Sequence, residues 1–334
     1  MMKVLDELKE DGFIIVYLDL FRVTSLQSFM RIYTTAIAKA SVTKLDEAIQ
    51  FLKDHIPTII PKIVLKGEGT TEFELDFESG KKDIEILLDD LYDLPQKIAI
   101  KRGKRIVVVF DEFQEIITLD LPIERQLRSK IQHHDRVAYC FMGSKRHLMD
   151  ELFQDKNKPL FKIAKTIPIG RILPEKLTSF IHTRFKFVHM QIESKLIDKI
   201  LQITSCHPCY TQQLCHEIFN RCISNVSNKK ERMVISSEDI GLAKDKCIQA
   251  QSYAYSTIWD GLTGKQKSLV LVLSLEPVAN LYSQDFLIRY SLPAPATMQT
   301  AVKALVRKGI LDHENGSYFV SDIFFVEWIK KKIA

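Results

Sequence analysis

The sequence predicts a parallel α/β region, then an all-helical region, and then a small domain of three helices and a hairpin. Three observations support this order. Short apolar runs such as Phe13–Leu18 and Ile106–Phe110 alternate with amphipathic helical segments in the first half. The strand signal ends near Pro174, and only helical periodicity follows. Asn315-Gly316 then marks a tight turn between two short strands near the end of the chain.

The first region alternates buried strands with helices, which implies right-handed crossovers and a doubly wound parallel sheet. The predicted sheet strands are 13–20, 105–110, 137–142 and 165–169, and 71–77 alternates like an edge hairpin strand. Helices are predicted at 2–10, 123–133 and 145–153. A further helix begins after Ser25, which can cap it, and another carries the apolar stripe Ile84, Leu87, Leu88 and Leu91.

The second half begins with four predicted helices and changes its pattern near Leu262. The helices are 175–187, 193–204, 210–224 and 236–258. Further helices at 263–275, 283–290 and 297–308 precede strands at 310–313 and 318–321. Three helices plus a hairpin are typical of a winged-helix domain.

Composition excludes several classes of protein. The chain has 334 residues, 46% hydrophobic and 27% charged, as in ordinary globular proteins of two or three domains. Its apolar runs fall far short of the roughly 20 residues that a membrane-spanning helix needs. Lys9, Glu10 and Asp11 interrupt any secretory signal, so we expect a cytoplasmic protein with no membrane partner. The net charge of +5 permits nucleic acid binding without indicating it.

A cysteine-rich stretch offers two interpretations. Four of the six cysteines lie close together, at Cys206, Cys209, Cys215 and Cys222. The spacing of the first two is that of zinc ligands or of a redox pair. Leu214, Ile218 and Cys222, however, form one apolar helical stripe, and free cysteine often packs in cores. We favour core packing over a metal site.

The most informative segment is IVVVFDEFQE, residues 106–115, a buried strand that ends in Asp111 and Glu112. Ligands of open parallel sheets bind outside the carboxyl ends of the strands. In phosphoryl-transfer proteins, one acid there holds the magnesium shell and another positions the attacking water. These two acids fit those roles. A structural acidic turn, or a metal-dependent hydrolase without a histidine cluster, stays open as an alternative.

Six segments in sequence order resemble the archaeal-type ATPase family, a branch of the AAA+ P-loop ATPases close to the STAND signalling ATPases. They are LKEDGFIIVYLDLFRVTSLQSF, IVVVFDEFQEI, YCFMGSKRHLMDELF, KTIPIGRILPEKLTSFI, CHPCYTQQLCHEIF and GSYFVSDIFFVEWI. The resemblance covers nearly the whole chain. It implies a P-loop-NTPase-like core at 1–172, a helical lid at 173–258 and a winged helix at 259–334, with ATP and Mg²⁺ as cofactors.

The resemblance also implies roles for residues of the core. Asp111 would hold magnesium through water, and Glu112 would polarise the hydrolytic water. Ser144, at the end of the strand that resembles the first sensor strand, would face the terminal phosphate. Arg146 is an alternative for that contact.

In the region that resembles the lid, Pro208 would lie against the adenine. Arg171 follows the last predicted strand of the core, and it could face a phosphate or a neighbouring subunit of a homo-oligomer. Cys206 stands where the family usually has glycine, which puts the backbone geometry of the lid in question at this point.

One part of the family pattern is missing from the sequence. P-loop ATPases carry Gly-x-x-x-x-Gly-Lys-Ser/Thr after the first strand. Here the Gly-Lys pairs that begin at Gly80, Gly103 and Gly264 lack the preceding glycine and the following hydroxyl. We therefore expect a core without its first strand and impaired ATPase activity. A misassigned start, a degenerate remnant and a strand donated by a partner are the three explanations, and we favour the first.

The leading functional hypothesis is a nucleotide-dependent switch ATPase. The alternative is a non-catalytic scaffold, in which the winged helix binds DNA or a protein. Arg289, Lys303, Arg307 and Lys308 could contact DNA phosphates. Few side chains of the expected recognition helix 297–308 could read bases, chiefly Gln299, Lys303 and Arg307.

The first prediction concerns the gene upstream of Met1. If the start is misassigned, the same frame should encode about 30 to 50 further residues, comprising an apolar strand and the phosphate-loop motif. Sequencing the upstream region tests this, and an in-frame stop codon directly before Met1 would leave the remnant hypothesis.

Overall fold

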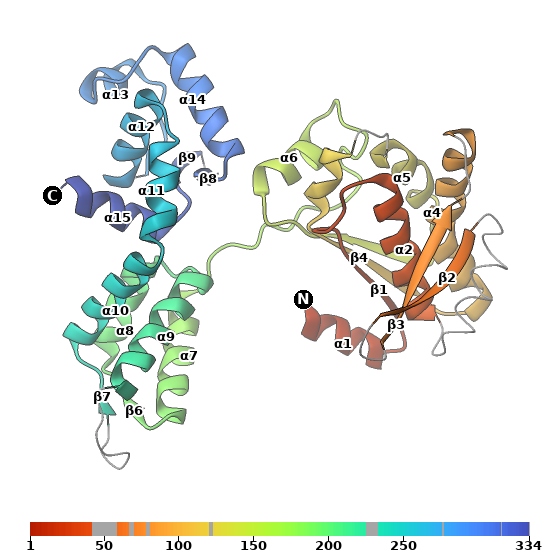
Figure 1. Cartoon of the computed structure of the whole chain (residues 1–334), viewed down its shortest axis with the longest axis horizontal. Helices are drawn as coiled ribbons and strands as arrows, with labels where there is room; N and C mark the ends of the chain where they lie inside the picture. The colour runs from red at the N-terminus through yellow and green to blue at the C-terminus, as the bar shows by residue number, and fades with distance from the viewer. Residues whose placement is uncertain are drawn as a thin grey trace. The chain divides into compact units, whose positions relative to one another are not determined.

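The computed structural model describes residues 1–41, 59–66, 70–77, 81–119, 123–224, 233–275, 277–314 and 316–333. The chain divides into two compact units, residues 1–167 and 168–334, which are called unit 1 and unit 2 (Figure 1). In the described part of the chain, no helix has the length and apolar character needed to cross a membrane.

The centre of unit 1 is a parallel sheet with the strand order β1-β4-β5. Its strands are β1 (Ile14–Asp19), β4 (Ile106–Asp111) and β5 (Val137–Phe141). The register places Asp19 beside Asp111 and Phe110 beside Phe141. β4 lies between the other two strands and is buried from Ile106 to Phe110. The parallel sheet predicted from these three apolar runs is therefore confirmed.

Helices cover both faces of this sheet (Figure 1). One face packs against α2 (Leu26–Ser41), α4 (Lys81–Arg102) and α5 (Ile123–Ile131). Its core is aromatic, with Tyr33 stacked on Phe110 and edge-on to Tyr92. The other face, around Val107 and Val109, is covered by α1 (Met2–Glu10) through the buried Leu5. The predicted capping of α2 is also present, because the Ser28 amide donates to Ser25 Oγ at 3.2 Å.

Three further elements complete unit 1. The antiparallel hairpin β2 (Ile59–Lys66) and β3 (Thr70–Phe77) contains the predicted edge strand. The 3-10 helix η1 (Phe113–Thr118) follows β4, and α6 (Arg146–Gln154) follows β5. The two elements after the sheet strands therefore begin at its carboxyl edge.

The prediction of a fourth sheet strand at 165–169 was wrong. These residues have no regular secondary structure, and Ile167 and Ile169 are 73% and 92% exposed. A strand exists only where a neighbour pairs with its backbone. Among the described residues, β5 forms the edge of the sheet and no further strand pairs with it. Residues 165–169 thus have the apolar pattern of a strand, but no described strand pairs with their backbone.

Unit 2 begins with the predicted helical region. Its helices are α7 (Pro174–Phe187), α8 (Ser194–Thr204), α9 (Pro208–Ser224), α10 (Ser237–Ala250) and α11 (Ser252–Asp260), and a two-residue parallel pair joins β6 (Met190–Gln191) to β7 (Met233–Val234). Ser236 and Asp239 form a capping box at the start of α10. The single helix predicted for 236–258 is two helices, because the backbone leaves the helical conformation at Gln251 (φ −106°, ψ 2°).

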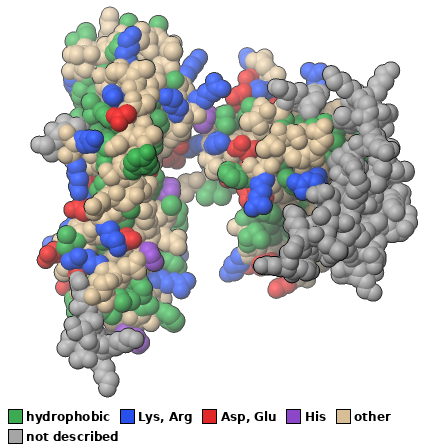
Figure 2. Space-filling model, viewed as in Figure 1, with side chains coloured by type: hydrophobic (Ala, Val, Ile, Leu, Met, Phe, Trp, Pro, Cys, Tyr) green, Lys and Arg blue, Asp and Glu red, His purple; other side chains and the backbone are tan. Residues whose placement is uncertain are grey.

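The winged-helix plan predicted for the C-terminal region is confirmed. It consists of α12 (Gly264–Leu275), α13 (Gln284–Arg289), α14 (Pro295–Arg307), β8 (Leu311–Glu314), β9 (Ser317–Val320) and α15 (Ile323–Ile333). Val278 bridges to Tyr318 beside the hairpin. Asn315 of the predicted turn lies outside the described residues. On the face in Figure 2, several Lys and Arg side chains lie over α13 and α14.

The helical region and the winged helix of unit 2 share one hydrophobic core. The ring of Tyr210 in α9 meets Phe324 in α15 edge-on, with 5.3 Å between ring centroids. The Tyr255 hydroxyl in α11 donates to the Asp322 carboxylate at 3.1 Å. Lys244 in α10 pairs with Glu327 at 2.9 Å. These contacts make unit 2 a continuous body.

The helical stripe Leu214, Ile218 and Cys222 is buried as predicted, whereas the other three cysteines of the stretch are exposed or half-buried. Cys222 is 7% exposed and lies in the core of unit 2 with Leu214 and Ile218. Cys209 is exposed, and the Cys206 and Cys215 side chains are half-buried. In the part of the chain that the structure describes, no three His, Cys, Asp or Glu side chains group as a metal site.

We expect that Cys206→Ser and Cys209→Ser leave the protein folded and that the purified protein carries no stoichiometric zinc. A structural zinc ion contributes folding free energy directly, so losing its ligands would lower the melting temperature. Elemental analysis and thermal unfolding measure both quantities. About one zinc per chain would contradict the expectation.

Candidate functional site

The carboxyl end of β4 places Asp111 on the sheet face that α1 covers, where it meets Tyr17 of the neighbouring strand. The Tyr17 hydroxyl donates a hydrogen bond to Asp111 Oδ2. The Glu112 amide donates to Asp111 Oδ1 at 3.0 Å. The bond to Asp111, together with burial and the nearby carboxylates, raises the pKa of Tyr17 to about 12. Tyr17 therefore remains a donor, and Asp111 has a fixed orientation.

Glu112 turns the chain sharply between β4 and η1. Its backbone is left-handed (φ 51°, ψ 43°), a conformation that costs a non-glycine residue of order 1 kcal/mol. The turn directs the Glu112 carboxylate toward the end of β5, where Ser144 Oγ donates to Glu112 Oε2 at 2.8 Å. Gln114 Nε2 donates to the same oxygen. Two polar side chains therefore hold the carboxylate in place.

The position of Gln114 depends on a glycine after β5. Gln114 is only 1% exposed. A Cβ atom added to Gly143 would lie 2.3 Å from Gln114 Oε1 and 2.5 Å from the Met149 sulfur. A side chain at this position would therefore require the Gln114 carboxamide and the Met149 side chain to shift. Beside it, Lys145 Nζ pairs with Glu115 Oε1 at 2.8 Å.

The structure brings Asp111, Glu112 and Ser144, which were predicted for the site, to one edge of the sheet. This is the carboxyl edge, and Ser144 bonds directly to Glu112 there. Arg146 is the first residue of α6, two positions after Ser144. The edge thus carries adjacent acids, a hydroxyl and the start of a helix.

The other two predicted residues, Arg171 and Pro208, lie near the turn between α8 and α9 in unit 2. The Arg171 guanidinium donates to the backbone carbonyl of Ser205. Ser205 and Cys206 both have left-handed backbones, with φ of 46° and 56°. Pro208 then begins α9. The positive φ at Cys206 is the conformation that glycine adopts most easily, and the cysteine adopts it here.

A histidine and a tyrosine flank this turn. The rings of His207 and Tyr210 have centroids 4.7 Å apart. Burial and the charge of Arg171 lower the pKa of His207, so this imidazole is neutral at physiological pH. The Thr204 and Thr211 hydroxyls share a buried hydrogen bond of 2.8 Å across the turn. The ring contact and the buried hydrogen bond therefore both fix the turn.

The acids of unit 1 suit a magnesium ion, since carboxylate oxygens are ligands that Mg²⁺ prefers, directly or through water. Asp111 and Glu112 together offer such oxygens at one edge. The fit to nucleotide phosphates is partial. At this edge, the Ser144 hydroxyl donates to Glu112, and the Lys145 ammonium is already paired with Glu115.

Sequence reasoning missed Tyr17, Gln114 and Gly143. Tyr17 was included only in an apolar strand, although a hydroxyl at a half-buried position of a sheet strand favours a hydrogen-bond partner. That partner depends on the register of β1 against β4. The Gln114 and Gly143 contacts depend on the left-handed turn at Glu112, for which no sequence pattern gives a signal.

Comparisons with known proteins agree with this architecture. Residues 253–331 match the family described as a probable winged helix domain. A Walker-type ATPase of Pyrococcus abyssi superimposes with a TM-score of 0.61 at 11% identity, over 96% of this chain and 85% of that chain. No curated protein sequence matches the chain.

Two other solved structures superimpose with lower scores. The Aeropyrum pernix ORC2 protein gives a TM-score of 0.46 at 11% identity, over 99% of this chain and 82% of that one. Cdc6p of Pyrobaculum aerophilum gives 0.41 at 12% identity, over 100% and 84%. From the Pyrococcus structure and the family match, the chain has the α/β fold of a P-loop ATPase, with a winged-helix domain at its C-terminus.

Proposed function

We propose that this protein belongs to the AAA+/STAND-like class of ATPases and acts as a nucleotide-dependent switch. The observation that carries the proposal is the cluster at the carboxyl end of β4. There, Asp111 and Glu112 follow a fully buried central strand, and Ser144 of the next strand end lies 2.8 Å from the Glu112 carboxylate. Parallel sheets bind ligands at this edge.

In this proposal, Asp111 holds the magnesium ion through water, with its carboxylate oriented by Tyr17. Glu112 orients the water that attacks the terminal phosphate. Ser144 donates to Glu112 in the present structure. If its hydroxyl turns to a phosphate oxygen instead, one Glu112 lone pair becomes available for water. Nucleotide binding and activation of Glu112 are thereby linked.

We assign the lid to residues 173–258. Pro208, at the start of α9, contacts the adenine, and Arg171 and Arg146 are candidates for phosphate or subunit contacts. The turn before Pro208 connects to the winged helix through the Tyr210–Phe324 contact. A change at the lid would therefore reach the winged helix, which reports the nucleotide state to a protein partner.

The 334 residues alone should bind ATP weakly and hydrolyse it negligibly. The sequence lacks Gly-x-x-x-x-Gly-Lys-Ser/Thr, whose amides and lysine supply much of the phosphate binding in P-loop ATPases. Titration with a fluorescent ATP analogue tests this. Micromolar affinity of these residues would contradict it and would mean that another segment or a partner chain supplies the phosphate site.

A form of the protein that carries the phosphate-loop motif ahead of Met1 should hydrolyse ATP. There, Glu112→Gln should abolish hydrolysis and leave binding unchanged, because the amide keeps the shape but loses the charge that orients water. Glu115→Gln is the matched control, since Glu115 pairs with Lys145 instead. Equal activity of the Glu112→Gln form and the parent would refute the role of Glu112.

DNA binding by the winged helix is the second candidate function. Helix α14 exposes Gln299, Lys303 and Arg307 and contains no acidic residue. Such a helix can enter the major groove and neutralise backbone phosphates. This function needs neither Asp111 nor Glu112, so it can be tested separately from ATP binding.

If α14 contacts DNA, replacing both Lys303 and Arg307 by Gln should weaken duplex binding. Each lost phosphate contact reduces the magnitude of the slope of log K against log salt concentration by about 0.9. The double variant should therefore reduce that magnitude by about 1.8. Gel-shift titrations at several salt concentrations measure this. Lys176→Gln with Lys195→Gln removes the same charge from exposed positions of α7 and α8 as a control. Equal slopes for the two double variants would exclude α14.

A further inference from the structure

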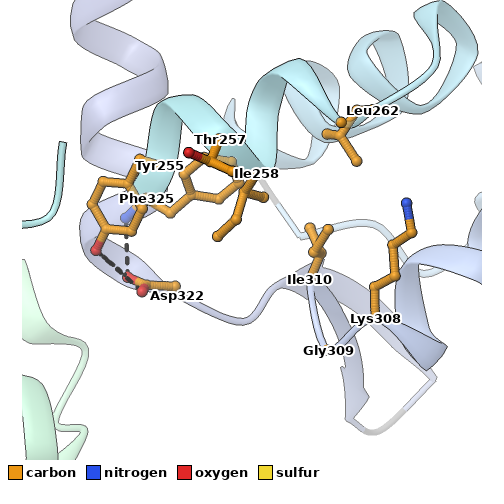
Figure 3. Close-up of a pocket in the computed structure, with 10 residues that line it drawn as sticks. Tyr255, Thr257, Ile258, Leu262, Lys308, Gly309, Ile310, Asp322 and Phe325 are labelled. Atoms are coloured by element: carbon orange, nitrogen blue, oxygen red, sulfur yellow. Dashed lines mark hydrogen bonds between the residues drawn. The ribbon is translucent and has the colours of Figure 1, made fainter. Parts of the chain in front are cut away.

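Unit 2 contains a cavity of about 380 Å³ that neither proposed function uses. It lies between α11, the junction of α14 with β8, and the start of α15 (Figure 3). Ile258, Leu262, Ile310 and Phe325 give it apolar walls. This volume falls within the range of natural small-molecule sites, which are apolar clefts with a few polar groups.

The Asp322 carboxylate lies at one end of the cavity, and hydrogen-bond donors of the protein itself stabilise its negative charge. Asp322 accepts hydrogen bonds from the Tyr255 hydroxyl at 3.1 and 3.2 Å (Figure 3). It also accepts from the Phe324 and Phe325 amides at 2.8 and 3.0 Å, at the positive end of α15. Three donors and a helix N-terminus therefore leave little attraction for a cationic ligand.

The backbone acceptors around the cavity are also used within the protein. At the end of α11, the Thr257 carbonyl accepts from the Gly261 amide at 3.1 Å. At the end of α14, the Leu305 carbonyl accepts from the Ile310 amide at 3.0 Å. The Thr257 hydroxyl donates to a carbonyl of its own helix at 3.0 Å. These two carbonyls and the Thr257 hydroxyl proton are therefore engaged within the protein.

Lys308 is the exception among these polar groups. It is exposed at the C-terminal end of α14, and within the described residues it makes no ion pair or hydrogen bond through its ammonium. Figure 3 shows its side chain at the edge of the cavity, away from Asp322. The cavity thus combines an apolar body with one available cationic donor.

We propose that this cavity binds a small amphipathic anion, namely a medium-chain aliphatic monocarboxylate. Its carboxylate pairs with Lys308 Nζ, and its chain lies against Ile258, Ile310 and Phe325. A cationic amphiphile would meet the Lys308 charge instead, and a polar anion would leave the apolar walls in water. The site does not depend on ATP binding.

Octanoate is the probe for this proposal, titrated into the full 334-residue chain by calorimetry below micelle-forming concentrations. We expect saturable binding of one octanoate per chain. Affinity should fall roughly threefold for each methylene removed along the series octanoate, hexanoate, butanoate. Octanol, which keeps the chain without the charge, should bind about threefold to fivefold more weakly than octanoate.

Two variants, Lys308→Met and Ile258→Glu, locate the site, and Lys303→Met is the control. Lys308→Met should weaken octanoate binding about threefold to fivefold and leave octanol binding unchanged. Lys303→Met, which removes an exposed lysine from another face of the same helix, should change neither. Ile258→Glu should abolish binding, because it places a carboxylate on the apolar wall. Ile258 is 39% exposed, so the fold should tolerate this change, and thermal unfolding checks it.

Three outcomes would overturn the proposal. They are the absence of saturable octanoate binding, equal affinity for octanol and octanoate, and equal effects of the Lys308→Met and Lys303→Met substitutions. None of them bears on the ATPase proposal, which concerns residues of unit 1 and the α8–α9 turn.

Discussion

The burial of β4 on both faces is the constraint on which unit 1 depends. Its residues from Ile106 to Phe110 contact helices on one side and α1 on the other, which fixes β4 between two parallel neighbours. Parallel pairing brings the carboxyl ends of all three strands to one edge. Tyr17 therefore meets Asp111, and Ser144 meets Glu112, although the partners of each pair are far apart in the sequence.

The sequence predicted those parts of the site that are encoded locally. A run of apolar residues followed by Asp111 and Glu112 defines both the strand and the polar end, and the resemblance added Ser144 at the next strand. Tyr17 and Gln114 could not be predicted, because their contacts arise from pairing register and from the left-handed turn at Glu112. The local pattern thus gives the acids of the proposed site, and tertiary geometry gives the side chains that hold them.

The two wrong predictions have the same origin. Residues 165–169 have the composition of a strand, but a strand requires a partner with free backbone groups at the right place. Gln251 leaves the helical conformation (φ −106°, ψ 2°) within a segment whose helical periodicity continues on both sides. In both cases the side-chain pattern alone does not determine the backbone.

Asp322 links the two halves of unit 2. It caps α15 of the winged helix and accepts a hydrogen bond from the Tyr255 hydroxyl of α11. Burial, together with the charge of Asp322, raises the pKa of Tyr210 in α9. Since Tyr210 also packs on Phe324, the turn before α9 and the start of α15 share a buried contact. Close-packed interiors have low compressibility and transmit displacement. A force applied at the Cys206–Pro208 turn would therefore move the winged helix together with the helical region of unit 2, so a switch acting there would need no separate relay within unit 2.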